Sequence, residues 1–189
     1  ALITQWQTFQ PQSITIDRDN YVYVAGNGWI YKFSSTGQTI DSWSFVNTTR
    51  PEDVKWSITA SNDGTIFVSG GSSIRRFTDS GEPLNQWSIG ENEYDYLRTR
   101  SLAVGADGTL YITSLWPARV ERFTPTGDFL EQWGSAGFGD GEFRNPCSIA
   151  ITPDQTILVG DESRRLQELD LTGKWLDSWE IFALGQMAA

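Results

Sequence analysis

Side chains that could carry out catalysis are scarce in this sequence. Its 189 residues include no histidine and one cysteine, Cys147. A cysteine nucleophile needs a neighbouring base, most often histidine, to activate it, and catalytic zinc sites also draw on histidine. We therefore expect Cys147 to be a small, buried residue beside a strand. The sequence predicts no catalytic residue, no metal ligand and no cofactor.

Arginine and tryptophan side chains could bind a ligand instead. Arginine pairs with a carboxylate through two parallel hydrogen bonds, so it suits a small anion or an acidic peptide. The candidates fall between or at the ends of expected strands: Arg50, Arg98, Arg100, Arg119, Arg144, Arg164, Trp29, Trp56 and Trp116. Aspartate and glutamate occur in the same segments, so a rim of mutually neutralising charges is the alternative.

A repeated unit must position these residues. A glycine followed six positions later by tryptophan occurs as Gly37/Trp43, Gly81/Trp87, Gly127/Trp133 and Gly173/Trp179. A serine that opens a strand recurs in phase with it, at Ser13, Ser57, Ser101 and Ser148. Both series repeat at steps of 44 to 47 residues, which is typical of four-stranded propeller blades. We expect each tryptophan to pack an outer strand against its neighbour.

Each unit contains four short strands separated by turn residues. The sequence therefore predicts an all-β propeller of four-stranded antiparallel blades, either a single domain or a segment of one. The complete blades are expected at 11–43, 51–87, 97–133 and 146–179, and residues 1–6 repeat the outermost strand without inner strands of their own.

The expected turns divide between two faces. Short turns join the first strand to the second and the third to the fourth, and we expect positive φ at Gly37, Gly81, Gly127 and Gly173. The second-to-third loops and the connections between blades lie on the opposite face, which we name the loop face. They are expected to be longer and more variable, and binding residues concentrate on such loops. We therefore predict that a partner contacts the loop face.

One segment carries a family resemblance. The run GFGDGEFRNP at 137–146, followed by the strand at 148–151, resembles the NHL-repeat pattern of β-propellers. The strands at 74–77 and 120–123 resemble it too. The resemblance implies a ring most often of six blades. Amidating-lyase relatives bind zinc through histidine, and streptogramin-lyase-like propellers use a histidine base; this sequence has no histidine for either role.

The composition of the chain excludes some classes of binding partner. The net charge of −10 and the pI near 4.4 argue against a nucleic-acid surface, which needs clustered positive charge. No apolar run approaches the roughly 20 residues that span a bilayer. The sequence starts without Met or a signal-like segment, so any targeting segment is expected to lie outside it or to have been removed. The compartment stays unknown, with a slight preference for an extracellular or periplasmic location.

We predict a non-enzymatic module that binds a protein partner, another copy of the chain or a small anionic ligand through the loop face. The alternative is a calcium-dependent hydrolase of the lactonase type, which needs inward carboxylates or amides at the inner-strand ends. The corresponding residues here are Gln12, Trp56, Arg100 and Cys147, a poor set for calcium. Four blades leave a ring incomplete, so we also expect further blades or another chain to cover the open flanks.

Overall fold

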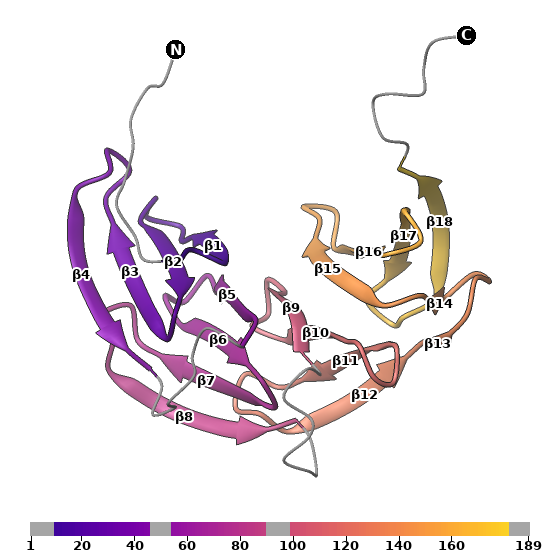
Figure 1. The fold of residues 1–189 in the computed structure, drawn as a ribbon, viewed down its shortest axis with the longest axis horizontal. Coiled ribbons are helices and arrows are strands. Elements are labelled where there is room, and N and C mark those ends of the chain that lie inside the picture. Colours follow the sequence, from indigo (N-terminus) through magenta and orange to yellow (C-terminus); the bar gives the residue numbers. More distant parts are fainter. Residues whose placement is uncertain (1–9, 46–53, 90–98, 182–189) are drawn as a thin grey trace, which may run out of the picture.

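The computed structural model of the chain describes residues 10–45, 54–89 and 99–181. Within these ranges the chain forms strands and turns and no helix, and so no helix that could cross a membrane. Four four-stranded antiparallel sheets follow one another along the chain and fan out around a common centre (Figure 1). The fold is the predicted all-β propeller arrangement of four-stranded blades.

Every blade is an up-and-down meander in chain order. Blade 1 consists of β1 (Ser13–Ile16), β2 (Val22–Gly26), β3 (Trp29–Phe33) and β4 (Thr39–Ser44). Blade 2 consists of β5 (Trp56–Ala60), β6 (Ile66–Gly70), β7 (Ser73–Phe77) and β8 (Pro83–Ser88). Blade 3 consists of β9 (Thr99–Val104), β10 (Leu110–Ser114), β11 (Arg119–Phe123) and β12 (Phe129–Trp133). Blade 4 consists of β15 (Pro146–Ile151), β16 (Thr156–Asp161), β17 (Arg165–Asp170) and β18 (Trp175–Glu180).

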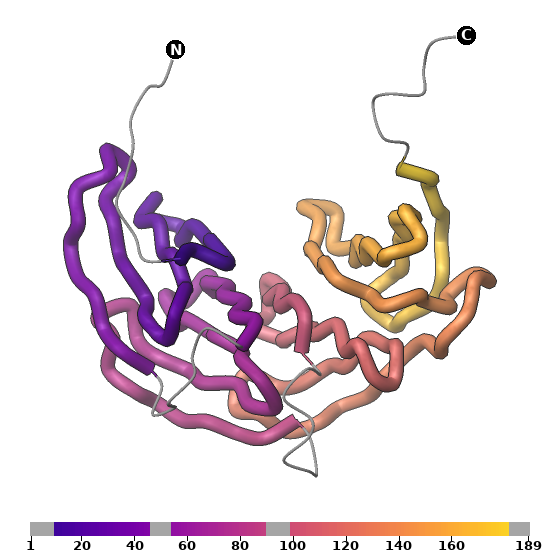
Figure 2. Tube along the Cα trace, in the orientation of Figure 1, coloured from indigo at the N-terminus to yellow at the C-terminus, as the bar shows by residue number. Residues whose placement is uncertain are grey.

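The first strands of the blades line the centre of the arc. Strand β5 contacts both β1 and β9, and β9 contacts β15, as the chain trace also shows (Figure 2). A short parallel ribbon of β13 (Ser135–Ala136) and β14 (Glu142–Phe143) lies in the connection from blade 3 to blade 4. Residues at the starts of β1, β5, β9 and β15 therefore come from four blades to one place.

The glycines of the third-to-fourth turns have the backbone conformation that the sequence predicts. Gly37, Gly81, Gly127 and Gly173 have φ values of 86°, 84°, 100° and 81°, which confirms the prediction of positive φ at all four. The expectation that the second-to-third loops are longer than the turns of the opposite face is wrong in all four blades, because these loops span two to four residues and the opposite turns span four or five; the loops are shortest in blades 1 and 2. There the strands are joined by two residues, Asn27–Gly28 and Gly71–Ser72, because Gly28 and Gly71 supply the positive φ that a tight hairpin needs.

The core lies between neighbouring blades. Tyr23 and Ile30 of blade 1 pack with Ile58 and Val68 of blade 2 in one buried cluster, and equivalent clusters join blades 2 and 3 and blades 3 and 4. Burying one such side chain contributes about 1.5–3 kcal/mol. The stability of the arc therefore depends on contacts between blades as well as within them.

A repeated hydrogen bond fixes the inner strands relative to one another. The backbone N–H of Ile58 donates to the Ser13 hydroxyl at 3.1 Å, and that of Leu102 donates to the Ser57 hydroxyl at 3.1 Å. Two of the four serines that mark the repeat in the sequence, Ser13 and Ser57, thus accept a bond from the following blade. At these two positions the hydroxyl links the inner strands of neighbouring blades.

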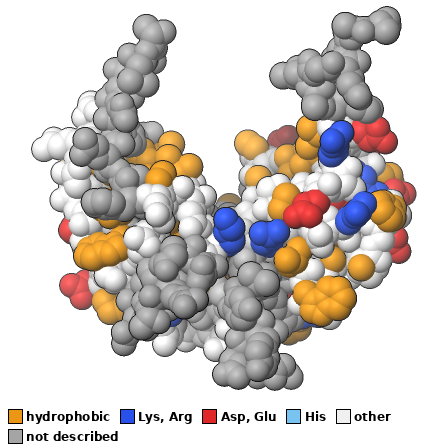
Figure 3. Space-filling view, viewed as in Figure 1, with side chains coloured by type: hydrophobic (Ala, Val, Ile, Leu, Met, Phe, Trp, Pro, Cys, Tyr) orange, Lys and Arg blue, Asp and Glu red, His pale blue; other side chains and the backbone are white. Residues whose placement is uncertain are grey.

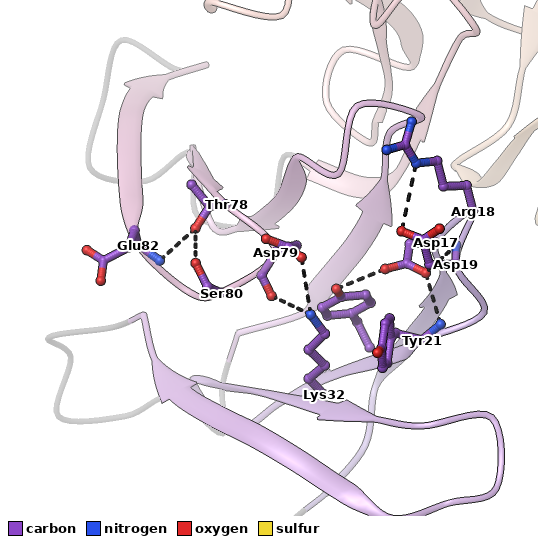
Figure 4. A network of polar contacts seen from close by, with 10 residues as sticks. Asp17, Arg18, Asp19, Tyr21, Lys32, Thr78, Asp79, Ser80 and Glu82 are labelled. Atoms are coloured by element: carbon purple, nitrogen blue, oxygen red, sulfur yellow. Dashed lines mark hydrogen bonds and ion pairs between the residues drawn. The ribbon is translucent and has the colours of Figure 1, made fainter.

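A lysine ties the outer part of blade 1 to blade 2 (Figure 4). The Lys32 ammonium donates to the backbone carbonyl of Asp79 at 2.8 Å and lies 3.4 Å from its carboxylate. The same ammonium lies 4.6 Å from the centre of the Tyr21 ring and 5.4 Å from that of Tyr23. Lys32 is buried, and its charge is stabilised by the Asp79 carbonyl and carboxylate and by the two tyrosine rings.

The arc is open between blade 1 and blade 4 (Figure 1). Ile14 on the free face of blade 1 is 63% exposed, whereas its counterpart Ile58, which blade 1 covers, is 3% exposed. Ile16 beside it is also largely exposed. The predicted outer strand at 1–6 lies outside the described residues.

Candidate functional site

A pocket opens at the centre of the arc, where the first strands of all four blades begin. Its volume is about 490 Å³, and its walls are Pro11, Gln12, Lys55, Trp56, Arg100, Cys147 and Glu162. Blades 1 to 4 thus each contribute at least one side chain. We name it the channel-mouth pocket. Figure 3 shows lysine and arginine side chains in the hollow at this centre.

Arg100, the arginine of this pocket, forms an ion pair with Glu162, and Glu162 in turn accepts a hydrogen bond from Asn145. The Arg100 guanidinium lies 3.2 Å from Glu162 Oε1, and Asn145 Nδ2 donates to Glu162 Oε2 at 2.9 Å. Arg100 Nε is shielded from solvent and has no hydrogen-bond partner among the described residues. An unpaired buried donor is costly. The ion pair with Glu162 orients the guanidinium in the wall of the pocket, where its terminal nitrogens have further donors for a ligand.

Lys55 supplies the second cation. It precedes β5 and is exposed, and no acidic side chain of the described ranges forms an ion pair with it. Gln12 Oε1 accepts the backbone N–H of Trp56 at 2.9 Å, which leaves the Gln12 amide NH₂ as a further donor. The channel-mouth pocket therefore combines two cations and an amide, which favours an anionic group.

Cys147 is exposed and lines this pocket, so the expectation that it is buried is wrong. The ladder between β15 and β16 shifts register between Pro146 and Ser148. The bulge takes Cys147 out of the strand alternation and turns its thiol toward the pocket. The thiol lies 3.5 Å from the carbonyl oxygen of Gly160.

A second pocket lies beside the first, on blade 4. Its volume is about 690 Å³, and its walls are Phe138, Arg144, Glu162, Ser163, Arg164, Arg165, Ser178, Trp179 and Glu180. We name it the blade-4 pocket. Glu162 belongs to the walls of both pockets. Viewed as in Figure 1, basic side chains extend from the central hollow across blade 4, with acidic ones among them (Figure 3).

The arginines of the blade-4 pocket have different surroundings. Arg165 donates to the carbonyl oxygens of Phe138 at 2.6 Å and Glu142 at 2.5 Å, so it fixes the glycine-rich connection. The Arg144 guanidinium lies 5.5 Å from the centre of the Phe138 ring. Arg144 and Arg164 are exposed. These two side chains, unlike Arg165, are available to a ligand.

The tryptophans expected at the loop face do not form one surface. Trp116 is 82% exposed and Trp29 is 42% exposed, on different blades. Trp56 is only 5% exposed, so the expectation of an exposed contact residue is wrong for it. Its indole packs edge-on against Phe45 at 4.8 Å and fills the space that the missing side chain of Gly70 leaves.

The arginines that were predicted to bind a ligand lie in different surroundings. Arg100 and Arg144 line the two neighbouring pockets. Arg119 donates to Glu121 at 2.6 Å, and because Glu121 is 2% exposed, this arginine neutralises a buried carboxylate. The prediction that Arg119 is free to bind an anionic ligand is therefore wrong. Arg50 and Arg98 lie outside the described residues.

Sequence reasoning missed Lys55 and Glu162 as partners in one site. A lysine directly before the strand position of Trp56 was a signal that could have found the first. The described residues hold no group of three or more His, Cys, Asp or Glu side chains placed to bind a metal ion. The inner-strand positions offer an indole, a guanidinium, a thiol and one amide, and the amide oxygen of Gln12 already accepts the Trp56 N–H. This is far from the six to eight oxygen ligands that calcium takes.

Comparison with known proteins supports the fold. A family model described as a beta-propeller repeat (SBBP) matches residues 3–34. The chain is thus similar to beta-propeller repeats over that segment, and the match does not single out the NHL type.

Solved structures extend the likeness to most of the chain. A protein of unknown function from Bacteroides caccae matches at 14% identity with a TM-score of 0.68, covering 90% of this chain and 60% of that one. Virginiamycin B lyase from Staphylococcus aureus matches at 19% identity with a TM-score of 0.65, covering 90% and 55%. A streptogramin B lyase matches at 17% identity with a TM-score of 0.68, covering 90% and 54%.

At these identities the likeness is one of fold. The chain spans 54–60% of the length of these three structures. The four blades therefore correspond to little more than half of each of them.

Proposed function

We propose that this propeller segment is a non-enzymatic binding module, and that the channel-mouth pocket holds a small ligand through its carboxylate. The observation that carries the proposal is the convergence of Gln12, Lys55 and Arg100, from three blades, on one pocket. Each contributes a donor that a carboxylate can accept from, and Trp56 and Pro11 supply apolar walls.

The charges favour a weak, specific complex. The chain as a whole is acidic, with a net charge of −10, so long-range attraction does not assist an anion. Binding depends instead on short-range hydrogen bonds to Lys55 and to Arg100. Charge-assisted hydrogen bonds contribute roughly 1.5–3 kcal/mol each. A small carboxylate with few other contacts is therefore expected to bind in the millimolar range.

Calorimetric titration with benzoate tests the proposal, with benzamide as a neutral probe of the same shape. We expect saturable binding of benzoate and none of benzamide. Lys55→Gln should weaken benzoate binding roughly tenfold, the equivalent of about 1.4 kcal/mol. The control is Lys174→Gln, because Lys174 is an exposed lysine in the β17–β18 turn, on the face opposite the loop face.

Three results would contradict this function. They are the absence of benzoate binding, equal binding of benzamide, and an affinity that Lys55→Gln leaves unchanged. Contact with a protein partner through Trp29 and Trp116 stays a prediction from the sequence.

A further inference from the structure

The two pockets share a wall, and this suggests a longer ligand than a single carboxylate. Glu162 lines both the channel-mouth pocket and the blade-4 pocket. Both of its oxygens are occupied, one by Arg100 and the other by Asn145. Because the Glu162 carboxylate between the pockets is already paired, it repels an anionic ligand less than an unpaired carboxylate would.

Basic side chains lie at both ends of this path. Lys55 and Arg100 line its inner end, and Arg144 and Arg164 line its outer end on blade 4. Among the described residues, Glu162 and Glu180 are the acidic side chains in the walls of the two pockets. In a chain of net charge −10, the walls of the two pockets carry a local excess of positive charge.

The outer end also has exposed aromatic surface and unusual backbone. Phe138 is exposed and stacks beside the Arg144 guanidinium, and Trp179 is exposed at the far wall. Asn145 and Arg164 have positive φ values of 53° and 66°. Asparagine adopts this region more readily than most residues, and Arg164 lies in the tight turn between β16 and β17. These conformations turn the chain directly after Arg144 and at Arg164.

From these observations we infer that the two pockets form one groove that binds an acidic peptide segment. The inference rests on the proposed function, since the inner carboxylate of the peptide occupies the channel-mouth pocket. A second acidic side chain of the same peptide then pairs with Arg144 and Arg164. Apolar parts of the peptide lie against Phe138 and Trp179. Arginine is suited to this role because its planar donors match a carboxylate.

The test compares two probes on the same variants. Acetyl-Glu-Glu-Glu-Glu-amide is titrated beside benzoate, with acetyl-Gln-Gln-Gln-Gln-amide as the neutral peptide. We expect the acidic peptide to bind at least tenfold more tightly than benzoate and the neutral peptide not to bind. Arg164→Gln should weaken the acidic peptide several-fold and leave benzoate unchanged, whereas Lys55→Gln should weaken both. Arg144→Gln is a second variant at the outer end.

Arg18→Gln is the matched control, because Arg18 is an exposed arginine in the β1–β2 turn, away from both pockets. Thermal melting of each variant verifies that it is folded. If Arg164→Gln and Arg144→Gln leave peptide affinity unchanged while Lys55→Gln weakens benzoate, the groove is wrong and the proposed function stands. If neither probe binds, both are wrong.

Discussion

Trp87 of β8 lies against the Gly127 turn of the next blade: a Cβ added to Gly127 would lie 2.5 Å from the indole. Trp43 lies in the same way against Gly81, and Trp133 against Gly173. The glycine and the tryptophan that repeat together in the sequence therefore meet across blades, each tryptophan packing against the glycine of the following unit.

This contact predicts that Gly127→Ala is strongly destabilising. The residue has φ of 100°, which costs an alanine about 1–2 kcal/mol, and the displaced indole adds about 1–3 kcal/mol of overpacking. We expect the free energy of unfolding, measured with urea, to fall by roughly 3 kcal/mol. Gly141→Ala is the control, because φ is 74° there but no atom lies within 4 Å. Equal losses in the two variants would contradict the role of Trp87.

Burial separates two tryptophans that the sequence treats alike. Trp56→Ala removes a buried indole, and we expect a loss of about 3–5 kcal/mol in the free energy of unfolding. Trp116→Ala removes an indole that is 82% exposed, and surface changes of this kind stay within about 0.5 kcal/mol. Denaturant unfolding of both variants measures the difference. A large loss at Trp116 would show that its indole packs against the protein.

The sequence predicted the repeat, the blade architecture and the turn glycines, because these depend on local periodicity and φ. It did not predict the surroundings of individual side chains. Trp56 is buried because Phe45 and Gly70, from two different blades, form its slot. Cys147 is exposed because a bulge interrupts the β15–β16 ladder. The surroundings of Trp56 depend on how two blades meet, and the exposure of Cys147 depends on an irregularity within one blade; the spacing of the repeat encodes neither of them directly.

Part of the candidate site was predictable, because some of its residues occupy equivalent positions of the repeat. The inner-strand positions Gln12, Trp56, Arg100 and Cys147 follow from the repeat, and they do meet at one pocket. The pairing of Arg119 with Glu121 is also local, two residues apart on β11, but the presence of both residue types in one strand does not by itself indicate that they pair. The role of Glu162 between two pockets requires the arrangement of blades 3 and 4, which only the structure supplies.

Lys32 is expected to contribute more to stability than its acidic partner. Its ammonium bonds the Asp79 backbone carbonyl at 2.8 Å, and this bond survives in Asp79→Asn. We therefore expect Asp79→Asn to cost less than about 1 kcal/mol, as exposed ion pairs do, and Lys32→Ala to cost about 2 kcal/mol through lost packing and the lost bond. Urea unfolding measures both values. A larger effect at Asp79 would mean that the ion pair itself dominates.

Acid should weaken the β5–β6 turn. The hydrogen bond from the Ser61 hydroxyl to Asp63, and then that from the Thr65 backbone N–H, hold the pKa of the Asp63 carboxyl below its ordinary value. A lowered folded-state pKa gives stability that is complete above the ordinary value of about 3.9 and is lost as pH falls through the folded-state pKa. We expect Asp63→Asn and Ser61→Ala to reduce the difference in unfolding free energy between pH 7 and pH 3. An unchanged difference would exclude this carboxyl as a contributor.

The free face of blade 1 should promote association. The residues that follow the repeat serines are buried in blades 2, 3 and 4, at Ile58, Leu102 and Ile149, whereas Ile14 in blade 1 is exposed. Exposed contiguous apolar surface of this kind marks an interface. We expect the 189-residue chain to sediment as more than a monomer at micromolar concentration and Ile14→Glu to shift it toward the monomer. Leu84→Glu, at an exposed leucine on β8, should leave the association unchanged. A wild-type chain that stays monomeric as its concentration rises would show that this face needs no partner.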